Sequence, residues 1–233
     1  MQAVILAAGR GTRMRELTQS ASKAMLTVAG KTLLEYELDA LPEEIDEVII
    51  IVGYMGSVIL QHIGGLYNGK RILYVEQEML NGTAGALWLA KDILKDQFIV
   101  LMADDLYDAK DIERCAKGED WLLFVEHVDR MQQGGNVIVD AKGHVVDIVE
   151  GTNHGGKTGL IGTNMFLLDT RIFEYPLVPK APDSEEFGLP QTVLAASKEG
   201  TIPLRVVKST SWLQISSPED LQKAEEMLQS KEV

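Results

Sequence analysis

The sequence predicts a single α/β domain, residues 1–233, with a central mixed, mostly parallel sheet and a small β-hairpin insertion. In the first half, short apolar runs rich in β-branched residues alternate with amphipathic segments. That order is typical of a parallel sheet with right-handed crossovers. The chain has 233 residues, of which 45% are hydrophobic, enough for one sizeable core.

The first half contains four apolar runs that we expect to be strands buried in a sheet. They span residues 2–8 (QAVILAA), 47–52, 71–75 and 98–102. The helices expected between them span residues 32–41, 57–63 and 83–94. Because ligands of such sheets bind beyond the carboxyl ends of the strands, the loops after Ala8, Val75 and Met102 should face one crevice.

The second half has a looser pattern. Its expected strands span residues 121–125, 160–168 and 202–207, and residues 136–140 and 144–149 should form the β-hairpin. Its expected helices span residues 189–197 and 218–229, the second capped by Ser216 or Ser217. Residues 151–158 and 176–188 are expected to be loops at the surface.

Composition excludes several classes of partner. The net charge of −13 argues against a nucleic acid or an anionic membrane, since both require basic surface. Cys115 is the only cysteine, so no internal disulfide can form, and we expect it to be a packed helix residue. No apolar run approaches the ~20 residues that span a bilayer, and no signal-like segment begins the sequence. We therefore expect a cytoplasmic protein.

A basic, glycine-rich segment follows the first strand: Gly9-Arg10-Gly11-Thr12-Arg13-Met14, with Lys23 further along. Glycine lets backbone N–H groups approach a ligand closely, and arginine presents a planar fork to phosphate oxygens. A dinucleotide fingerprint would need a third glycine where Met14 stands. The segment therefore predicts an anion-binding loop of another kind.

Leu6-Ala7-Ala8-Gly9-Arg10-Gly11-Thr12-Arg13-Met14 and Ser22-Lys23-Ala24-Met25-Leu26 together resemble the signature of the nucleotide-sugar pyrophosphorylases. These are nucleoside-diphospho-sugar nucleotidyltransferases of the GT-A-like fold, with L-A-[AG]-G-x-G-T-R-[LM] followed by P-K-x-[LM]; Ser22 replaces the proline. The resemblance implies a Rossmann-like GT-A-type domain that joins a nucleoside triphosphate to a sugar 1-phosphate. Residues 1–107 would be its nucleotide-binding half, and residues 108–233 its sugar-binding half and closing helix. We expect no left-handed β-helix, since hexapeptide repeats are lacking.

The resemblance assigns nucleotide contacts in two segments. The first holds Leu6, Ala8, Gly9, Gly11 and Thr12; the second holds Gln77, Gly82 and Thr83, where Asn81-Gly82-Thr83-Ala84-Gly85-Ala86-Leu87 is similar to the family's base-recognition segment. Without the resemblance, these small residues would fit a closely packed helix N-terminus equally well. Arg13 and Lys23 are the implied catalytic residues, which neutralise the transferring and leaving phosphate oxygens.

The resemblance also implies a Mg²⁺ site. Asp104 stands where the family places its metal-binding Asp, and Trp212-Leu213-Gln214-Ile215 resembles W-x-D-[IV], with Gln214 at the second metal ligand. An amide oxygen is a hard ligand that Mg²⁺ accepts, although Gln214 would equally serve as a hydrogen-bonding side chain. Asp105 is an extra carboxylate that would bind the sugar, bind metal through water or face solvent.

Sugar contacts are implied at three more places. Gly135 in Gly134-Gly135-Asn136-Val137 resembles the Gly of Y-G-x-[IV], and Glu150 resembles the Glu of E-x-K-P. The lysine of that motif is missing after Glu150, and Lys157 is a candidate replacement. Thr163 begins a segment similar to [NT]-[TA]-G-[IL], with Asn164 in place of glycine.

Two other functions remain open from the sequence. One is a cytidylyltransferase that acts on a phospho-alcohol, because it would share the N-terminal motif. The other is a non-catalytic relative that binds a nucleotide or sugar phosphate, which the departures at Ser22, Gly151 and Gln214 suggest. The expected partners are a nucleoside triphosphate and a sugar 1-phosphate, with neither nucleic acid nor membrane, and a homo-oligomer is left open.

Overall fold

The computed structural model describes residues 1–18, 21–131, 134–151 and 155–231. Its sheet is organised around β1 (Gln2–Ala7), in which every residue is buried. β1 lies parallel between β4 (Glu47–Val52) and β7 (Gln97–Met102). A strand with sheet on both sides and helices over both faces has no wet surface, which explains its uninterrupted apolar sequence.

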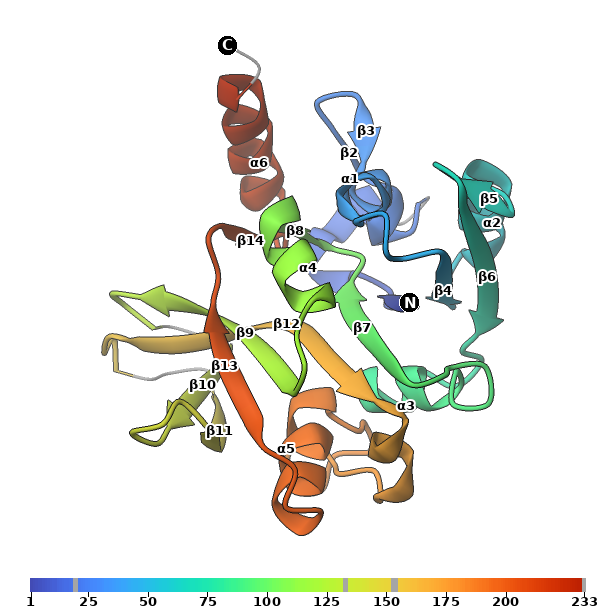
Figure 1. Cartoon of the computed structure of the whole chain (residues 1–233). Helices are drawn as coiled ribbons and strands as arrows, with labels where there is room; N and C mark the ends of the chain where they lie inside the picture. Colours follow the sequence, from blue (N-terminus) through green and yellow to red (C-terminus); the bar gives the residue numbers. More distant parts are fainter. Residues whose placement is uncertain (19–20, 132–133, 152–154, 232–233) are drawn as a thin grey trace.

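The sheet is mixed, as predicted, with a parallel centre and antiparallel additions (Figure 1). Its order is β11-β10-β12-β7-β1-β4-β6-β5, and β9 pairs with both β12 and β13. Apart from the three central strands, its members are β5 (Leu66–Tyr67), β6 (Lys70–Glu76), β9 (Trp121–Val128), β10 (Gly134–Val139), β11 (Val145–Gly151), β12 (Gly159–Asp169) and β13 (Leu204–Lys208). β10 and β11 form the expected antiparallel hairpin at one edge.

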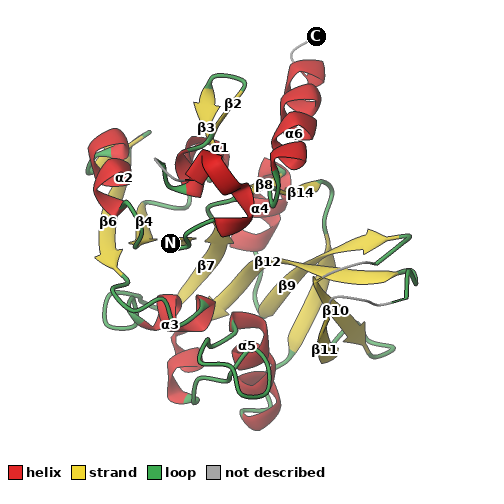
Figure 2. Ribbon diagram, turned by 180° about the vertical axis from the view of Figure 1, so that it is seen from behind, coloured by secondary structure: helices red, strands yellow, loops and turns green. Residues whose placement is uncertain are grey.

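Helices cover both faces of the sheet (Figures 1 and 2). One face carries α1 (Leu33–Ala40), α2 (Gly56–Ile63) and α4 (Ala109–Ala116); the other carries α3 (Thr83–Trp88) and α5 (Leu189–Glu199). Successive side chains of β1 point to opposite faces of the sheet. Val4 packs in the cluster that includes α3 and α5, whereas Ile5 packs in the cluster that includes α1, α2 and α4. Cys115 is buried in α4 as expected, and burial raises the pKa of its thiol.

The structure shortens one expected helix and adds two short ribbons that were not expected. α3 ends at Trp88 rather than at Leu94, and tighter turns follow it, with Leu89 N–H donating to the Ala86 carbonyl. Two small ribbons were not predicted: β2 (Thr27–Val28) with β3 (Lys31–Thr32), and β8 (Asp105–Tyr107) with β14 (Trp212–Gln214). Strands this short lack a hydrophobic period, so only the folded chain reveals them.

The closing helix α6 (Pro218–Lys231) begins with a reciprocal cap. Ser217 Oγ accepts from the Asp220 N–H, and Asp220 Oδ2 accepts from the N–H groups of Ser216 and Ser217. Ala224 of α6 packs with Met14 in a third apolar cluster, which anchors the segment that carries β14. No helix in the described ranges has the length and apolar character needed to cross a membrane.

Candidate active site

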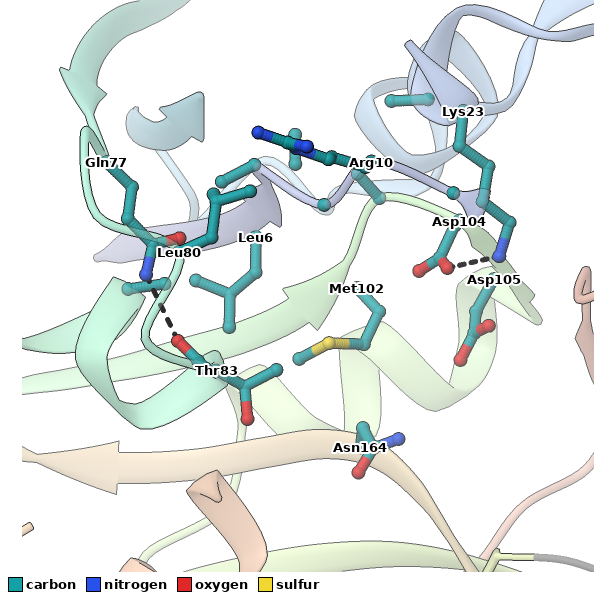
Figure 3. Close-up of a pocket in the computed structure, with 18 of the residues that line it drawn as sticks. Leu6, Arg10, Lys23, Gln77, Leu80, Thr83, Met102, Asp104, Asp105 and Asn164 are labelled. Carbon is teal, nitrogen blue, oxygen red and sulfur yellow. Dashed lines mark hydrogen bonds and ion pairs between the residues drawn. The ribbon is translucent and has the colours of Figure 1, made fainter. Parts of the chain in front are cut away.

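A cavity of about 550 Å³ lies at the carboxyl ends of β1, β6 and β7 (Figure 3). Its wall includes residues 6–14 after and at the end of β1, Gln77 and Leu80 after β6, and residues 102–105 at the end of β7. The structure therefore brings together the three loops that the strand order predicted to share a crevice.

The basic loop after β1 is shaped by Gly11 and packs against Lys23. Gly11 has a left-handed φ of +61°, and a Cβ there would lie 2.9 Å from Cβ of Lys23. Thr18 Oγ1 donates to the Gly11 carbonyl at 3.0 Å and so closes the loop. Arg10, Thr12 and Arg13 remain exposed along the cavity. Glycine is thus required at position 11 for both its conformation and its close contact.

Lys23 and Asp104 form an ion pair inside the cavity (Figure 3). Lys23 begins a 3-10 turn, Lys23–Met25, and its side chain is only 10% exposed, against 36% for that of Asp104. A nearly buried ammonium requires a countercharge, and Asp104 supplies it directly after β7. The two groups predicted for catalysis and for metal binding are therefore direct neighbours.

Exposure to solvent was one of the three possibilities considered for Asp105, and the structure excludes it. Its residue is 1% exposed, and Oδ2 accepts from Trp212 Nε1 at 3.0 Å and from the Tyr107 hydroxyl at 3.4 Å. Oδ1 is buried and finds no partner within the described residues. Burial, together with the neighbouring Asp104 carboxylate, raises the pKa of Asp105 well above its usual range.

A second buried acid lies behind Asp105. Glu37 of α1 is 1% exposed, and its Oε2 has no hydrogen-bond partner in the described part of the chain. Burial raises its pKa well above the ordinary value, and Asp105 and Asp104 raise it further. Both buried carboxyl groups therefore favour the protonated form, because burial disfavours their charged state.

Gln77 lies at the end of the cavity away from Lys23 and Asp104 (Figure 3), and Gly82 also lines the cavity. Gln77 Nε2 donates to Asn81 Oδ1 at 3.0 Å and to the Gly82 carbonyl at 3.2 Å. Because both of these partners are acceptors, the amide nitrogen must face them, and Oε1 is left to accept from a ligand. Thr83 Oγ1 accepts from the Leu189 N–H at 3.0 Å, so this hydroxyl oxygen joins α3 to α5.

The segment 176–188, expected to be a surface loop, instead contributes to the cavity. Lys180, Glu186 and Phe187 line it. Phe187 N–H donates to the Asn81 carbonyl at 2.7 Å, and the Ala84 N–H donates to the Phe187 carbonyl at 3.1 Å. A Cβ on Gly82, whose φ is +97°, would lie 2.3 Å from that carbonyl. Sequence reasoning missed this wall because polar and proline-rich residues show no period.

Of the predicted sugar contacts, Asp105 lines this cavity, whereas Gly135, Glu150 and Thr163 do not. Thr163 is fully buried, and its Oγ1 donates to the Phe124 carbonyl at 3.0 Å. Gly135 and Glu150 face each other across the β10–β11 hairpin, where Glu150 is exposed and accepts from Gln191 Nε2 at 3.3 Å. Asn164 lines the cavity instead, at an irregularity of β12 with a left-handed φ of +59°. Asn164 stands where the related family has a glycine. This replacement could have identified it as a residue of the site, since Asn tolerates a left-handed backbone conformation.

The oxygen ligands at one end of the cavity fit a magnesium ion. Within the described ranges, no three His, Cys, Asp or Glu side chains converge as a metal cluster would. Asp104 and Gln214 both line the cavity, and Gln214 pairs with Asp105 across the β8–β14 ribbon. Mg²⁺ prefers hard oxygen ligands and takes only one or two from protein when substrate phosphates supply others. This pair of side chains suits such an ion.

A doubly covered α/β sheet whose cavity holds a glycine-rich basic loop, a lysine–aspartate pair and a glutamine at its far end is the arrangement expected of a nucleotide-handling enzyme. The model of the nucleotidyl transferase family matches residues 2–231, so the chain belongs to that family.

Two relatives and one solved structure show which members of the family this chain resembles. A UTP–glucose-1-phosphate uridylyltransferase of Haloferax volcanii is 28% identical, over 98% of this chain and 97% of the relative. The bifunctional protein GlmU of Methanocaldococcus jannaschii is 27% identical over 99% of this chain, which spans only 55% of that relative. The crystal structure of a Bacillus anthracis protein, in complex with sucrose, shares the fold with a TM-score of 0.81 at 23% identity, over 97% of this chain and 94% of that one.

Proposed function

We propose that this protein joins a nucleoside triphosphate to a sugar 1-phosphate and releases pyrophosphate. The observation that carries the proposal is the single cavity with a basic glycine loop, the Lys23–Asp104 pair and the Gln77–Gly82 recess along its wall. These three features match the three parts of a nucleoside triphosphate: the phosphates, the reacting phosphorus with its charge, and the base.

In the proposed reaction, an oxygen of the sugar phosphate attacks the α-phosphorus, and the bond from that phosphorus to the pyrophosphate oxygen breaks. No general base is needed, because the attacking oxygen is already an anion. The chain's task is to bring two anions together in line and to offset the charge on the transferring group. Correct alignment alone supplies on the order of 7–11 kcal/mol in well-oriented reactions.

Different residues of the cavity bind the phosphates and offset their charge. The backbone of residues 9–12 holds the phosphates, and Arg13 and Lys23 offset charge on the transferring and leaving oxygens. Asp104 keeps the Lys23 ammonium in position. When bound at Asp104 and Gln214, Mg²⁺ would supply further positive charge to the phosphates.

Base selection falls to Gln77. Its free Oε1 is an acceptor, so it suits an N–H on the edge of a base, such as the one that uracil presents. UTP with glucose 1-phosphate, the pair in the name of the Haloferax relative, is therefore the first combination to test.

The test is a pyrophosphate-release assay with Mg²⁺. UTP, dTTP, CTP, GTP and ATP are each combined with the 1-phosphates of glucose, galactose, mannose and N-acetylglucosamine. We expect turnover with one preferred pair, and its loss in Lys23→Ala and Asp104→Ala. Silence across the panel, while nucleotide still binds the folded protein, would overturn the proposal. Turnover of CTP with a phospho-alcohol in the same assay would establish the cytidylyltransferase alternative instead.

A further inference from the structure

We propose that Lys180 binds the phosphate group of the sugar 1-phosphate. This inference rests on the proposed function and deepens it, because it names the residue that receives the second anionic substrate. The reaction requires two anions in one cavity, and each needs positive charge beside it.

The cations of the cavity are unevenly distributed. The described residues that line it include four: Arg10, Arg13, Lys23 and Lys180. The first three belong to the connection after β1, and Lys23 is already paired with Asp104. Lys180 comes from the segment before α5, more than a hundred and fifty residues later in the sequence. It is thus the one cation of the described wall that does not belong to the triphosphate loop.

Lys180 lies between the base recess and the hairpin that carries Glu150. A Cβ on Gly188 would contact Lys180 Cβ at 2.9 Å and Gln191 Oε1 at 1.8 Å, so all three residues are packed together. Gln191 Nε2 in turn donates to Glu150 Oε1. On the other side, Phe187 bonds to Asn81 beside Gly82. Lys180 therefore belongs to a part of the cavity wall that is available to an acceptor bound beside the nucleotide.

The position of Lys180 is determined by backbone hydrogen bonds. Its N–H donates to the Glu186 carbonyl at 2.9 Å, and the Gly188 N–H donates to the Val178 carbonyl at 3.0 Å. Its ammonium pairs with the Glu186 carboxylate, but both side chains are about half exposed, 54% and 50%. Such an exposed pair contributes at most about 1 kcal/mol. A phosphate dianion, with more charge and more acceptor oxygens, can take the place of this carboxylate.

The alternative lysine considered from the sequence is placed less favourably. Lys157 is exposed in the segment that precedes β12, and it is not part of the cavity wall. It has the same charge and side-chain length as Lys180. Lys157→Met is therefore a matched control for Lys180→Met.

The experiment is steady-state kinetics on the full chain with the preferred substrate pair, varying each substrate in turn. Lys180→Met should raise the KM for the sugar 1-phosphate at least tenfold and leave the KM for the nucleotide within twofold. Lys180→Arg should retain the KM within a few-fold, since it keeps the charge. Lys157→Met should leave both KM values unchanged.

Glu186→Gln separates phosphate binding from a structural role. If Lys180 merely fastens its segment through Glu186, Glu186→Gln will raise the acceptor KM as much as Lys180→Met does, and the inference is overturned. If Lys180 binds phosphate, Glu186→Gln will leave that KM unchanged or lower it. An unaltered acceptor KM in Lys180→Met, with the wild type active, overturns this inference alone. A wild type without turnover on any pair overturns the proposed function and this inference together.

Discussion

The two walls of the cavity differ in how they are built. The nucleotide wall, residues 9–13 together with Lys23, Gln77 and Gly82, comes from short connections that directly follow β1 and β6. The acceptor wall, Asn164, Lys180, Glu186, Phe187 and Gln214, comes from β12, β14 and the segment before α5. The first wall comes from two connections in the N-terminal part of the chain, whereas the second is assembled from three segments of the C-terminal part.

The acceptor wall also depends on the nucleotide wall for its position. Phe187 is held by backbone bonds to Asn81 and Ala84, and its carbonyl approaches Gly82 so closely that no side chain fits between them. The nucleotide wall instead carries its own support, in the Thr18–Gly11 bond and the Lys23–Asp104 pair. Change at the nucleotide wall should therefore affect both substrates, and change at the acceptor wall only one.

The largest effect is expected from Lys23→Ala in the nucleotide wall. It removes the ammonium that pairs with Asp104 and that, in the proposed reaction, offsets phosphate charge. We expect kcat/KM to fall by roughly 10²–10⁴-fold, the range seen when one charge-stabilising group is lost. Pyrophosphate release measures this loss, and a thermal melt checks the fold. Lys91→Ala, an exposed lysine outside the cavity, should stay near wild type; equal loss in both variants would contradict the assignment.

Gly82→Ala tests the contact between the two walls. An added Cβ would meet the Phe187 carbonyl at 2.3 Å, and the φ of +97° disfavours any side chain. We expect a loss of about 1–3 kcal/mol in the free energy of unfolding. Both KM values should rise, each by about tenfold, which is about 1.4 kcal/mol of binding.

Gly65→Ala is the matched control for Gly82→Ala. Its Cβ would meet nothing within 4 Å, and its φ lies outside the left-handed region. It should change the free energy of unfolding by no more than about 0.5 kcal/mol in chemical denaturation. If Gly82→Ala behaved like Gly65→Ala in both stability and KM, the walls would be independent.

Gln214→Ala tests the metal side of the acceptor wall. If its amide oxygen is a ligand, the Mg²⁺ concentration for half-maximal activity should rise several-fold, while saturating Mg²⁺ restores most of kcat. Gln222→Ala on the exposed surface of α6 provides the comparison and should not shift the Mg²⁺ titration. An unshifted titration in Gln214→Ala would leave Asp104 as the sole protein ligand of the proposal.

The smallest effect is expected from Glu37, the buried acid close to Asp104 and Asp105. The pKa of Glu37 is raised above its ordinary 4.5 by burial, then by Asp105 and Asp104, so the folded state keeps a proton that the unfolded state releases. The contribution of Glu37 to the free energy of unfolding is therefore fully present below its ordinary pKa of 4.5, and it is lost as pH rises through the raised pKa of the folded state. Glu37→Gln should stabilise the protein by about 1–2 kcal/mol at pH 8 and by little at pH 4.

Chemical denaturation at the two pH values measures the effect of Glu37→Gln. The exposed Glu43, changed in the same way, should show no such pH-dependent gain. A gain for Glu37→Gln that is equal at both pH values would show that packing, not protonation, explains it.

Particular residues show where sequence reasoning succeeds. The run of residues 2–8 predicted a doubly buried strand because the side chains of β1 after Gln2 are apolar and pack in two cores. Gly11 and Gly82 were both expected in the site, and both take left-handed conformations that other residues resist. In these cases, local backbone geometry and residue type determine the feature together.

Other residues show where it fails. Thr163 shared a motif with Asn164, yet the irregularity in β12 turns Thr163 into the core and leaves Asn164 in the cavity. Asp105 is adjacent to Asp104, yet the pairing of β8 with β14 buries it beneath Trp212. Pairing with a distant strand therefore decides how two adjacent side chains differ in burial and contacts.

The sequence by itself determined the parallel centre of the sheet and the glycine-rich basic loop after β1, because strand burial, glycine conformation and charge act over a few neighbouring residues. The assignment of Gln77 and Gly82 to the same site came from the resemblance to a family. Only the tertiary structure decided the acceptor wall. Lys180, Phe187 and Gln214 meet there through backbone pairings between segments far apart in the chain. Such pairings depend on how whole elements pack, and no local pattern of side chains records them.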